Sequence, residues 1–140
     1  MQAERARIRR LRRLEQVRAM ACRQAAAEAT RAEGHFAQTQ ALAGRTQAML
    51  DEYRARTAQT DGLALRQLSQ FTSGLSGIAA TTTSDAEQAR QSADQAQQAL
   101  SRAERSRSAV EDRVRAGESA LARKQTSPVL TARRIGTGLE

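Results

Sequence analysis

The sequence has few of the residues on which many folds and active sites depend. Its 140 residues contain one Cys, one His, one Pro, one Tyr, two Phe and no Trp. One Cys and one His exclude a disulfide framework, a zinc site and a Cys/His nucleophile built from this chain alone. Scarce aromatic residues argue against sheet structures and against modules that stack nucleic-acid bases on aromatic rings.

Long apolar runs and catalytic motifs are missing as well. No apolar run follows the basic segment 5–13, so we expect neither a signal-peptide core nor a membrane span. The chain has no phosphate-binding glycine loop and no carboxylate pair in a pocket-forming context. We therefore expect a cytoplasmic protein that is not an enzyme, with no catalytic, cofactor-binding or metal-binding residues.

The composition is typical of long paired helices. Ala accounts for 29 residues, whereas Leu, Ile, Val and Phe together make up only 21 of the 140, too few to fill a globular core. A low apolar content with a net charge of +8 is also typical of disorder. The abundance of Ala, Glu, Arg, Gln and Leu favours helices, and the spacing of the apolar residues separates the two possibilities.

A seven-residue repeat runs through both halves of the chain. In the first half, the core positions a and d are occupied by Cys22, Ala25, Ala29, Ala32, Phe36, Thr39, Ala43, Thr46, Leu50 and Tyr53. In the second half they are occupied by Ala86, Ala89, Ala93, Ala96, Leu100, Ala103, Val110, Val114 and Leu121, with Arg107 and Gly117 as exceptions. Such a repeat predicts a coiled coil.

The repeat also extends toward the N-terminus and backwards from the second half. Upstream of Cys22, we expect the stripe to drift through Ile8, Leu11, Leu14 and Val17, as it does in a straight helix. Backwards from Ala86, the register takes in Leu65, Leu68, Leu75, Ala79 and Thr82.

The two halves meet at Thr60-Asp61-Gly62, the best turn signal in the first half of the chain. The sequence thus predicts an all-α fold, an antiparallel two-helix coiled-coil hairpin within residues 1–125. Helix 1 should span about 3–57, the turn about 58–63 and helix 2 about 64–125, giving a rod of about 80 to 90 Å at 1.5 Å per residue. Ser127-Pro128 should end helix 2, leaving a disordered tail over 126–140.

Two finer features follow from this hairpin. The residues expected to face each other are Tyr53 with Leu68, Phe36 with Asp85 and Ala86, and Leu11 with Val110. Helix 2 is expected to bend or break at Thr81 to Asp85, because this segment holds poor helix formers followed by a Ser84/Glu87 pair spaced as a capping box.

Charge is distributed unevenly along the chain. Residues 1–25 hold eight Arg and two Glu, residues 26–100 hold six Arg and eight acids, and residues 101–140 hold nine bases and five acids. The hairpin brings both basic segments to one end, where an acidic partner would relieve their mutual repulsion. A solvated basic face is the plainer alternative. Nucleic acid is not favoured, because Arg5, Arg9, Arg12 and Arg13 match no known reading motif.

A second candidate surface lies on helix 2. Phe71, Leu75, Ile78 and Thr82 share one helical face, but Phe71 and Ile78 fall beside the core stripe. Two bulky apolar side chains beside a narrow two-helix core cannot both be well covered. The pattern predicts that part of this face is exposed and forms a docking site, although the residues could also widen the core.

The sequence resembles a known family over roughly residues 5–125. A basic first helix, the segment Asp51-Glu52-Tyr53-Arg54 near its end, and Phe71-x-x-x-Leu75-x-x-Ile78 early in an Ala- and Gln-rich second helix look like the FliJ family of the flagellar type III export apparatus. The resemblance implies a cytoplasmic stalk similar to the central gamma subunit of rotary ATPases. It also implies that the paired termini sit in the export ATPase ring and that the turn-proximal half meets the export gate protein FlhA.

Site residues are carried over from this resemblance by position. The export-gate contacts would be Phe71, Leu75, Ile78 and Thr82, the last a polar residue where the family can have a larger one. The ATPase-ring contacts would be Arg5, Arg9, Arg12, Arg13, Arg113 and Arg115. Export chaperones are further implied partners, and the cytoplasmic face of the inner membrane is the implied location.

Two alternatives stay open at the level of sequence. Injectisome stalk proteins share the same architecture. A basic coiled-coil protein could instead bind nucleic acid or an anionic membrane through its arginine-rich end.

Overall fold

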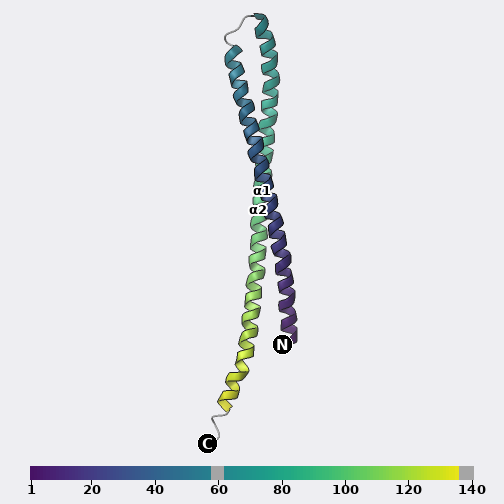
Figure 1. The fold of residues 1–140 in the computed structure, drawn as a ribbon, viewed down its shortest axis with the longest axis vertical. Helices are drawn as coiled ribbons and strands as arrows, with labels where there is room; N and C mark the ends of the chain where they lie inside the picture. Colours follow the sequence, from purple (N-terminus) through teal and green to yellow (C-terminus); the bar gives the residue numbers. More distant parts are fainter. Residues whose placement is uncertain (58–61, 136–140) are drawn as a thin grey trace. The chain divides into compact units, whose positions relative to one another are not determined.

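The computed structural model consists of two long helices that pack against each other. It describes the backbone over residues 1–57 and 62–135 and the side chains over 1–57 and 62–126. Helix α1 spans Gln2–Thr57 and helix α2 spans Gly62–Ile135, with no strand in these described residues. The predicted all-α, antiparallel two-helix fold is confirmed (Figure 1).

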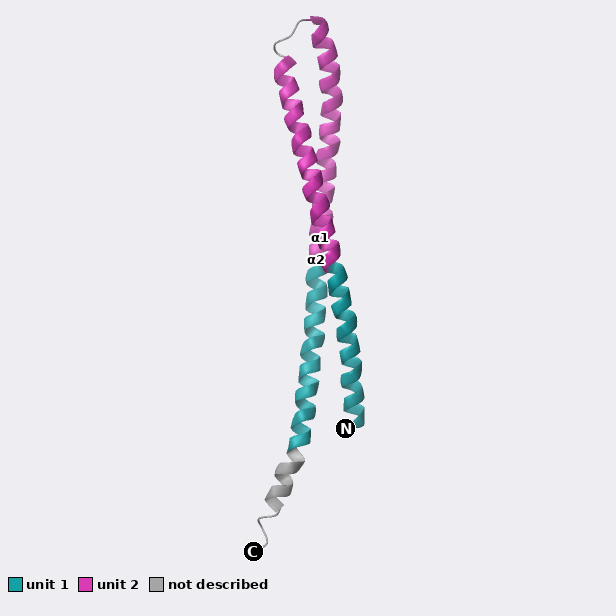
Figure 2. Ribbon diagram, viewed as in Figure 1, with its two compact units in different colours: residues 1–25, 100–140 teal, residues 26–99 magenta. Residues whose placement is uncertain are grey.

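The chain divides into two compact units, each containing one segment of α1 beside an antiparallel segment of α2 (Figure 2). The terminal unit comprises residues 1–25 and 100–140. The turn unit comprises residues 26–99. Each candidate surface predicted from the sequence therefore lies within one unit. The arginines lie in the terminal unit and the Phe71 face lies in the turn unit.

The core follows the predicted repeat closely. All ten predicted core residues of α1 between Cys22 and Tyr53 are buried or half-buried. In the turn unit, Leu50, Leu75 and Ala79 form a buried cluster against which Tyr53 packs. Thr46 fits into this core because its hydroxyl donates to the carbonyl of Leu42 at 2.8 Å, which leaves no unsatisfied donor.

The core of α2 also follows the predicted repeat, and Arg107, one of the two expected exceptions, lies outside it. The predicted positions that are buried or half-buried are Leu68, Leu75, Ala79, Thr82, Ala86, Ala89, Ala93, Ala96, Leu100, Ala103, Val110, Val114, Gly117 and Leu121. Arg107 is exposed and the neighbouring Ser106 is half-buried in its place. Leu65 was expected in the core but is exposed near the beginning of α2.

The expected drift upstream of Cys22 is wrong. Ile8 is buried and Leu11 half-buried as expected, but Leu14 and Val17 are exposed. The core is completed instead by Glu15 and Ala19, both half-buried. Ile8, Glu15 and Cys22 keep the seven-residue spacing, whereas Ala19 lies one position after the strict repeat, at which Arg18 is exposed. Coiling of paired helices around each other removes the drift of a straight helix and accounts for the retained spacing.

The facing residues are shifted by about one helical turn of 3.6 residues along α2. The ring of Tyr53 contacts that of Phe71, and a Cβ on Gly117 would lie 3.4 Å from Cγ1 of Ile8. Leu68 borders the same surface hollow as Tyr53, as expected. Leu11 borders a hollow with Arg113, Ala116 and Gly117, which lie later in α2 than the expected Val110. The shift arises because the first turns of α2 extend past the end of α1 (Figure 1).

Helix α2 is continuous through the segment where a bend or break was expected. The hydroxyl of Thr81 donates to the carbonyl of Gly77 at 3.0 Å, and that of Thr82 donates to Ala79 at 3.0 Å. These bonds satisfy the hydroxyls within the helix. Glu87 pairs with Arg90 instead of capping a new helix.

The predicted ends of α2 are also corrected. The helix begins at Gly62 instead of 64 and continues to Ile135 instead of 125. Proline inside a helix removes one hydrogen bond and crowds the carbonyl four residues earlier, yet α2 continues past Pro128. Residues 58–61 of the predicted turn and 136–140 of the predicted tail lie outside the described residues.

Because the core is narrow, truncating a buried leucine should cost far more stability than truncating an exposed one on the same helix. Leu50 is 3% exposed and Leu42 is 48% exposed. We expect Leu50→Ala to lower the free energy of unfolding by about 2 to 4 kcal/mol and Leu42→Ala by less than about 0.5 kcal/mol. Urea denaturation followed by circular dichroism would measure both. Equal losses would contradict the assigned core.

Candidate functional site

The helix-2 face predicted to bind a partner separates into exposed and buried residues. Phe71 is 48% exposed and Ile78 is 56% exposed, as expected for side chains beside the core stripe. Leu75 is only 8% exposed and Thr82 is also buried. Leu75 and Thr82 therefore hold α2 against α1, and the surface available to a partner is that of Phe71 and Ile78.

Phe71 is held in place by residues near the end of α1. Its ring meets that of Tyr53 edge to face, with the centroids 4.8 Å apart and the planes at 62°. The guanidinium of Arg56 lies 5.3 Å from the Tyr53 centroid and donates to Glu52 Oε1 at 2.8 Å. Edge-to-face and cation–π contacts of this kind fix the orientation of an exposed ring, so less freedom is lost when a partner binds it.

The surface of α2 around Phe71 and Ile78 is uncharged and sparsely covered. Residues 67–84 contain no Asp, Glu, Lys, Arg or His. A Cβ placed on Gly74 or Gly77 would meet no atom within 4 Å. A partner's backbone could therefore approach this part of α2 closely without displacing charged side chains.

Two exposed residues of α1, Leu42 and Met49, were missed by the sequence analysis. They are 48% and 46% exposed. Each directly precedes a core a residue, as do Phe71 and Ile78 in α2. In an antiparallel pair, the residues that precede a on both helices flank the same side of the core. This shared position was the available signal, and these four residues are called the apolar face below.

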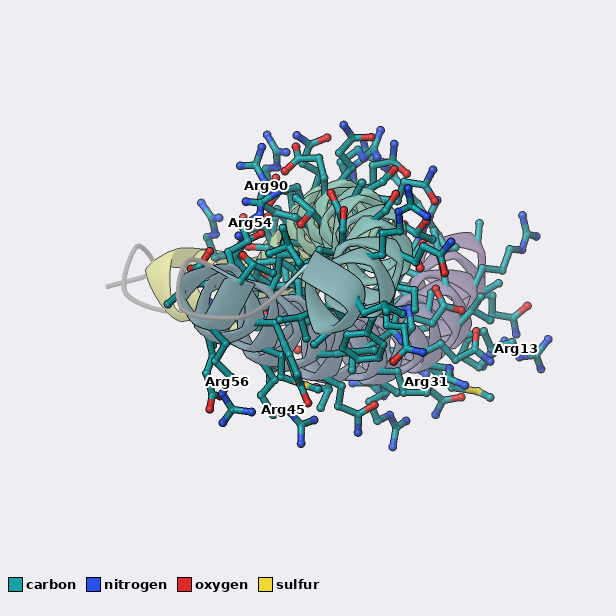
Figure 3. The ribbon with its side chains drawn as sticks, turned by 90° about the horizontal axis from the view of Figure 1, so that it is seen from above. Arg13, Arg31, Arg45, Arg54, Arg56 and Arg90 are labelled. Atoms are coloured by element: carbon teal, nitrogen blue, oxygen red, sulfur yellow. The ribbon has the colours of Figure 1, made fainter. Side chains whose placement is uncertain are left out.

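The opposite side of the turn unit is polar. Gln47 and Arg54 from α1 border a shallow groove together with Ser76, Thr83 and Glu87 from α2. Figure 3 shows Arg54 and Arg90 on one side of the helix pair and Arg45 and Arg56 on the other. Arg90 donates to Glu87 at 2.7 Å, which lowers the pKa of that carboxyl. The two sides of the turn unit therefore differ in chemistry.

The arginines predicted to contact an ATPase ring lie in the terminal unit but have different roles. Arg12 does not stand free: its Nε donates to Glu118 Oε1 at 3.0 Å and its Nη2 donates to the same oxygen, so it joins α1 to α2. Lys124 likewise bonds to Glu4. These two ion pairs hold the helices together and neutralise part of the basic charge.

The other predicted arginines are exposed and form no ion pair with any residue in the described part of the chain. They are Arg5, Arg9, Arg13, Arg113 and Arg115. The structure brings some arginines of the two helices together, since Arg7 and Arg113 border one hollow while Arg12 and Arg115 border another. Positive charge is therefore presented on more than one side of the terminal unit.

Apolar side chains accompany these arginines. Leu14, Val17 and Met20 are exposed on α1. Sequence reasoning placed Leu14 and Val17 in the core and overlooked Met20. A strict seven-residue repeat counted back from Cys22 would have left all three outside the core positions. A partner that binds the terminal unit would thus meet apolar contacts among positive charges.

Within residues 1–57 and 62–135, no helical stretch is long and apolar enough to cross a membrane. No family model matches this chain, and neither a curated protein nor a solved structure matches it significantly. Its function is therefore inferred from its own residues and their geometry.

The Lys124–Glu4 pair gives a testable pKa. The hydrogen bond from Lys124 lowers the pKa of Glu4; partial desolvation opposes this effect, and nearby positive charges add to it. We expect Lys124→Gln to raise the pKa of Glu4 toward its ordinary value. Arg123→Gln removes the same charge without breaking this bond and should change the pKa much less. A carboxyl carbon NMR titration would measure both.

The sign of the pH dependence follows from this lowered pKa. A carboxyl whose folded-state pKa is depressed adds stability above its unfolded pKa, and that contribution is lost as the pH falls through the folded value. Lys124→Gln should therefore lose stability near neutral pH and little in acid below the folded pKa. An unchanged titration of Glu4 would show that the pair does not form in solution.

Proposed function

We propose that this chain is a non-enzymatic stalk of a flagellar protein export apparatus that couples the export ATPase ring to the export gate. The observation that carries the proposal is the exposed pair Phe71 and Ile78, held next to a buried core in the turn unit. It matches the stripe through which the FliJ family is expected to meet its gate protein. The two segments that carry the resemblance, 51–54 of α1 and 71–78 of α2, also contact each other through the rings of Tyr53 and Phe71, which gives a structural reason for their occurring together.

The terminal unit would be the part that meets the ATPase ring. Its unpaired arginines suit an acidic inner surface, and its exposed Val17 and Met20 would add apolar contact. Because exposed charges mainly raise association rates and fix orientation, these arginines would guide the terminal unit into the ring. Arg12 would act indirectly by keeping α1 beside α2 through Glu118.

The turn unit would meet the gate protein through Phe71 and Ile78. Leu75 and Thr82 support this contact from the core, which removes the difficulty of a polar Thr82 at a contact position. Under this proposal the protein works in the cytoplasm, at the cytoplasmic face of the inner membrane, and export chaperones are further partners. An injectisome stalk would differ in which ATPase and gate protein it binds.

Removing the unpaired arginines should weaken ATPase binding. We expect Arg5→Gln, Arg9→Gln and Arg13→Gln together to weaken binding to the purified flagellar export ATPase by about tenfold at low salt, and less at high salt because salt screens exposed charges. Helicity should change little, since Gln is a good helix former. Binding and ATPase stimulation would be measured together.

A matched control removes the same charge from the turn unit. Arg31→Gln, Arg54→Gln and Arg66→Gln should leave ATPase binding near that of the wild type. Equal weakening by both triples would mean that net charge alone matters. If the wild type ignored the ATPase and bound duplex DNA with a steep salt dependence, the nucleic-acid alternative would replace the proposal.

Truncating the exposed pair should abolish gate binding without unfolding the protein. We expect Phe71→Ala with Ile78→Ala to lower the free energy of unfolding by less than about 2 kcal/mol, most of it from the Tyr53 contact, because neither side chain is fully buried. Binding to the cytoplasmic domain of the flagellar export gate protein and motility should both be lost.

Leu75→Ala is the contrasting variant. It should destabilise the turn unit by about 2 to 4 kcal/mol, as expected for a buried leucine. At temperatures where it stays folded, it should still bind the gate protein. A double mutant of Phe71 and Ile78 that melts below Leu75→Ala would assign these side chains to the core and remove the docking site.

A further inference from the structure

The outward surface of α1 in the terminal unit combines exposed apolar side chains with arginines. Its residues, called the outer patch below, are Arg10, Arg13, Leu14, Val17 and Met20. We infer that the outer patch binds the anionic surface of a lipid bilayer, with its apolar side chains among the upper parts of the acyl chains and its arginines at the lipid phosphates. This contact goes beyond the proposed function, because it needs neither the ATPase nor the gate protein.

The outer patch lies opposite the contact with α2. Each residue advances about 100° around an α-helix, so Val17 lies about 200° around α1 from the core residue Glu15. Val17 is accordingly 61% exposed and Met20 is 57% exposed. Arg13, Val17 and Met20 are spaced i, i+4 and i+7, and Leu14 precedes Val17 by three residues. Side chains with these spacings are neighbours on one side of a helix.

The acids of this segment face α2 and leave the outer patch purely basic and apolar. Residues 1–25 contain two acids, Glu4 and Glu15, and both are half-buried. Glu4 bonds to Lys124 of α2. Glu15 borders a hollow together with Arg115 of α2. A negatively charged surface that approached the outer patch would therefore meet positive charge without a nearby exposed acid to repel it.

Two arginines stand beside the apolar side chains of the outer patch. Arg10 precedes Leu14 by four residues and Arg13 precedes Val17 by four, so each arginine neighbours an apolar residue. Both are exposed and form no ion pair with any residue whose side chain the structure describes. Figure 3 shows Arg13 extending outward from α1.

Arginine suits a lipid phosphate in this position. A guanidinium binds a phosphate through two parallel hydrogen bonds. Its long apolar stem lets the charged group stay at the level of the headgroups while neighbouring apolar side chains reach more deeply. Basic residues on a helix with an exposed apolar stripe are typical of helices that lie in the bilayer interface.

A lipid surface accounts for both parts of the outer patch. The hollows that border Arg7 and Arg12 lie between the helices, and neither is lined by Val17 or Met20. The outer patch is instead the convex surface of one helix. Nucleic acid would engage the arginines and leave the apolar side chains in water, whereas a bilayer interface binds both. Because an ATPase ring would contact the same side chains, lipid and ring would be bound in turn.

The experiment measures how the full chain binds sedimenting lipid vesicles at low salt. The wild type should bind vesicles that contain phosphatidylglycerol about tenfold more tightly than vesicles of phosphatidylcholine alone, because only the former carry net negative charge. Val17→Gln with Met20→Gln should weaken binding to the phosphatidylglycerol vesicles by about tenfold, and helicity should change little. Arg10→Gln with Arg13→Gln should also weaken it by about tenfold, and this loss should fade as salt rises.

Matched controls make the same changes in the turn unit. Leu42→Gln with Met49→Gln replaces two exposed apolar side chains of the apolar face. Arg31→Gln with Arg54→Gln removes two positive charges. Both controls should bind phosphatidylglycerol vesicles as the wild type does, because neither changes the outer patch.

A spin label reports whether the outer patch enters the bilayer. Placed at position 17 in a Cys22→Ala background, the label should become less accessible to an aqueous relaxing agent and more accessible to oxygen when vesicles are added. A label at position 42 in the same background should show neither change. A label at position 17 that stays in water on the vesicles would contradict insertion of the apolar side chains.

The remaining outcomes separate the inference from the proposed function. Equal binding to both kinds of vesicle would overturn the inference, and so would wild-type binding by the Val17/Met20 variant. Binding to duplex DNA but not to vesicles would assign the arginines to nucleic acid. A failure with lipid leaves the proposed function standing, since neither the ATPase nor the gate protein is present. A chain that ignored both proteins but bound vesicles through the outer patch would lose the proposed function and keep the inference.

Discussion

The close packing of small side chains along the two helices is the interaction on which the rest of the structure depends. Ala29, Ala89 and Ala93 are buried, and the few larger buried residues lie mainly toward either end of the paired region. Each buried methyl group contributes only about 0.8 kcal/mol, so stability is spread over the full length of the pairing. No single layer dominates. Because the helices approach closely, however, the core is narrow and cannot cover bulky residues at its margins.

That limit separates core residues from surface residues within one short segment. Leu75 lies on the stripe and is buried, whereas Phe71 and Ile78 lie only one position away from it and are exposed. The same limit leaves Leu42 and Met49 exposed on α1. In a globular core these four would simply add bulk. Beside two helices they form a surface, and the edge-to-face contact of Phe71 with Tyr53 keeps part of that surface ordered before any partner binds.

The sequence predicts what depends on spacing within one helix and misses what depends on how the helices align. The burial of Ala29 and Leu50 and the exposure of Phe71 and Ile78 follow from a seven-residue repeat counted along each helix. The contact of Ile8 with Gly117 does not, because the register depends on how far α2 extends past the end of α1. The pairing of Arg12 with Glu118 depends on the same register, so an arginine assigned to a partner instead holds the helices together. Leu14 and Val17 were placed wrongly because the supercoil removes a drift that a straight helix would show.

Lys124 has a chemical consequence that its ion pair alone does not reveal. It is the only lysine among 23 basic residues, so its amine is the only side-chain amine that the chain offers to acylating reagents or to enzymes that modify lysine. That amine is bound to Glu4 on the other helix. Acetylation would remove its charge and disrupt this link, while every arginine would keep its charge. Among the side chains, amine chemistry can thus act on a single position at the basic end of the molecule, and that position takes part in one of the two ion pairs that join the helices there.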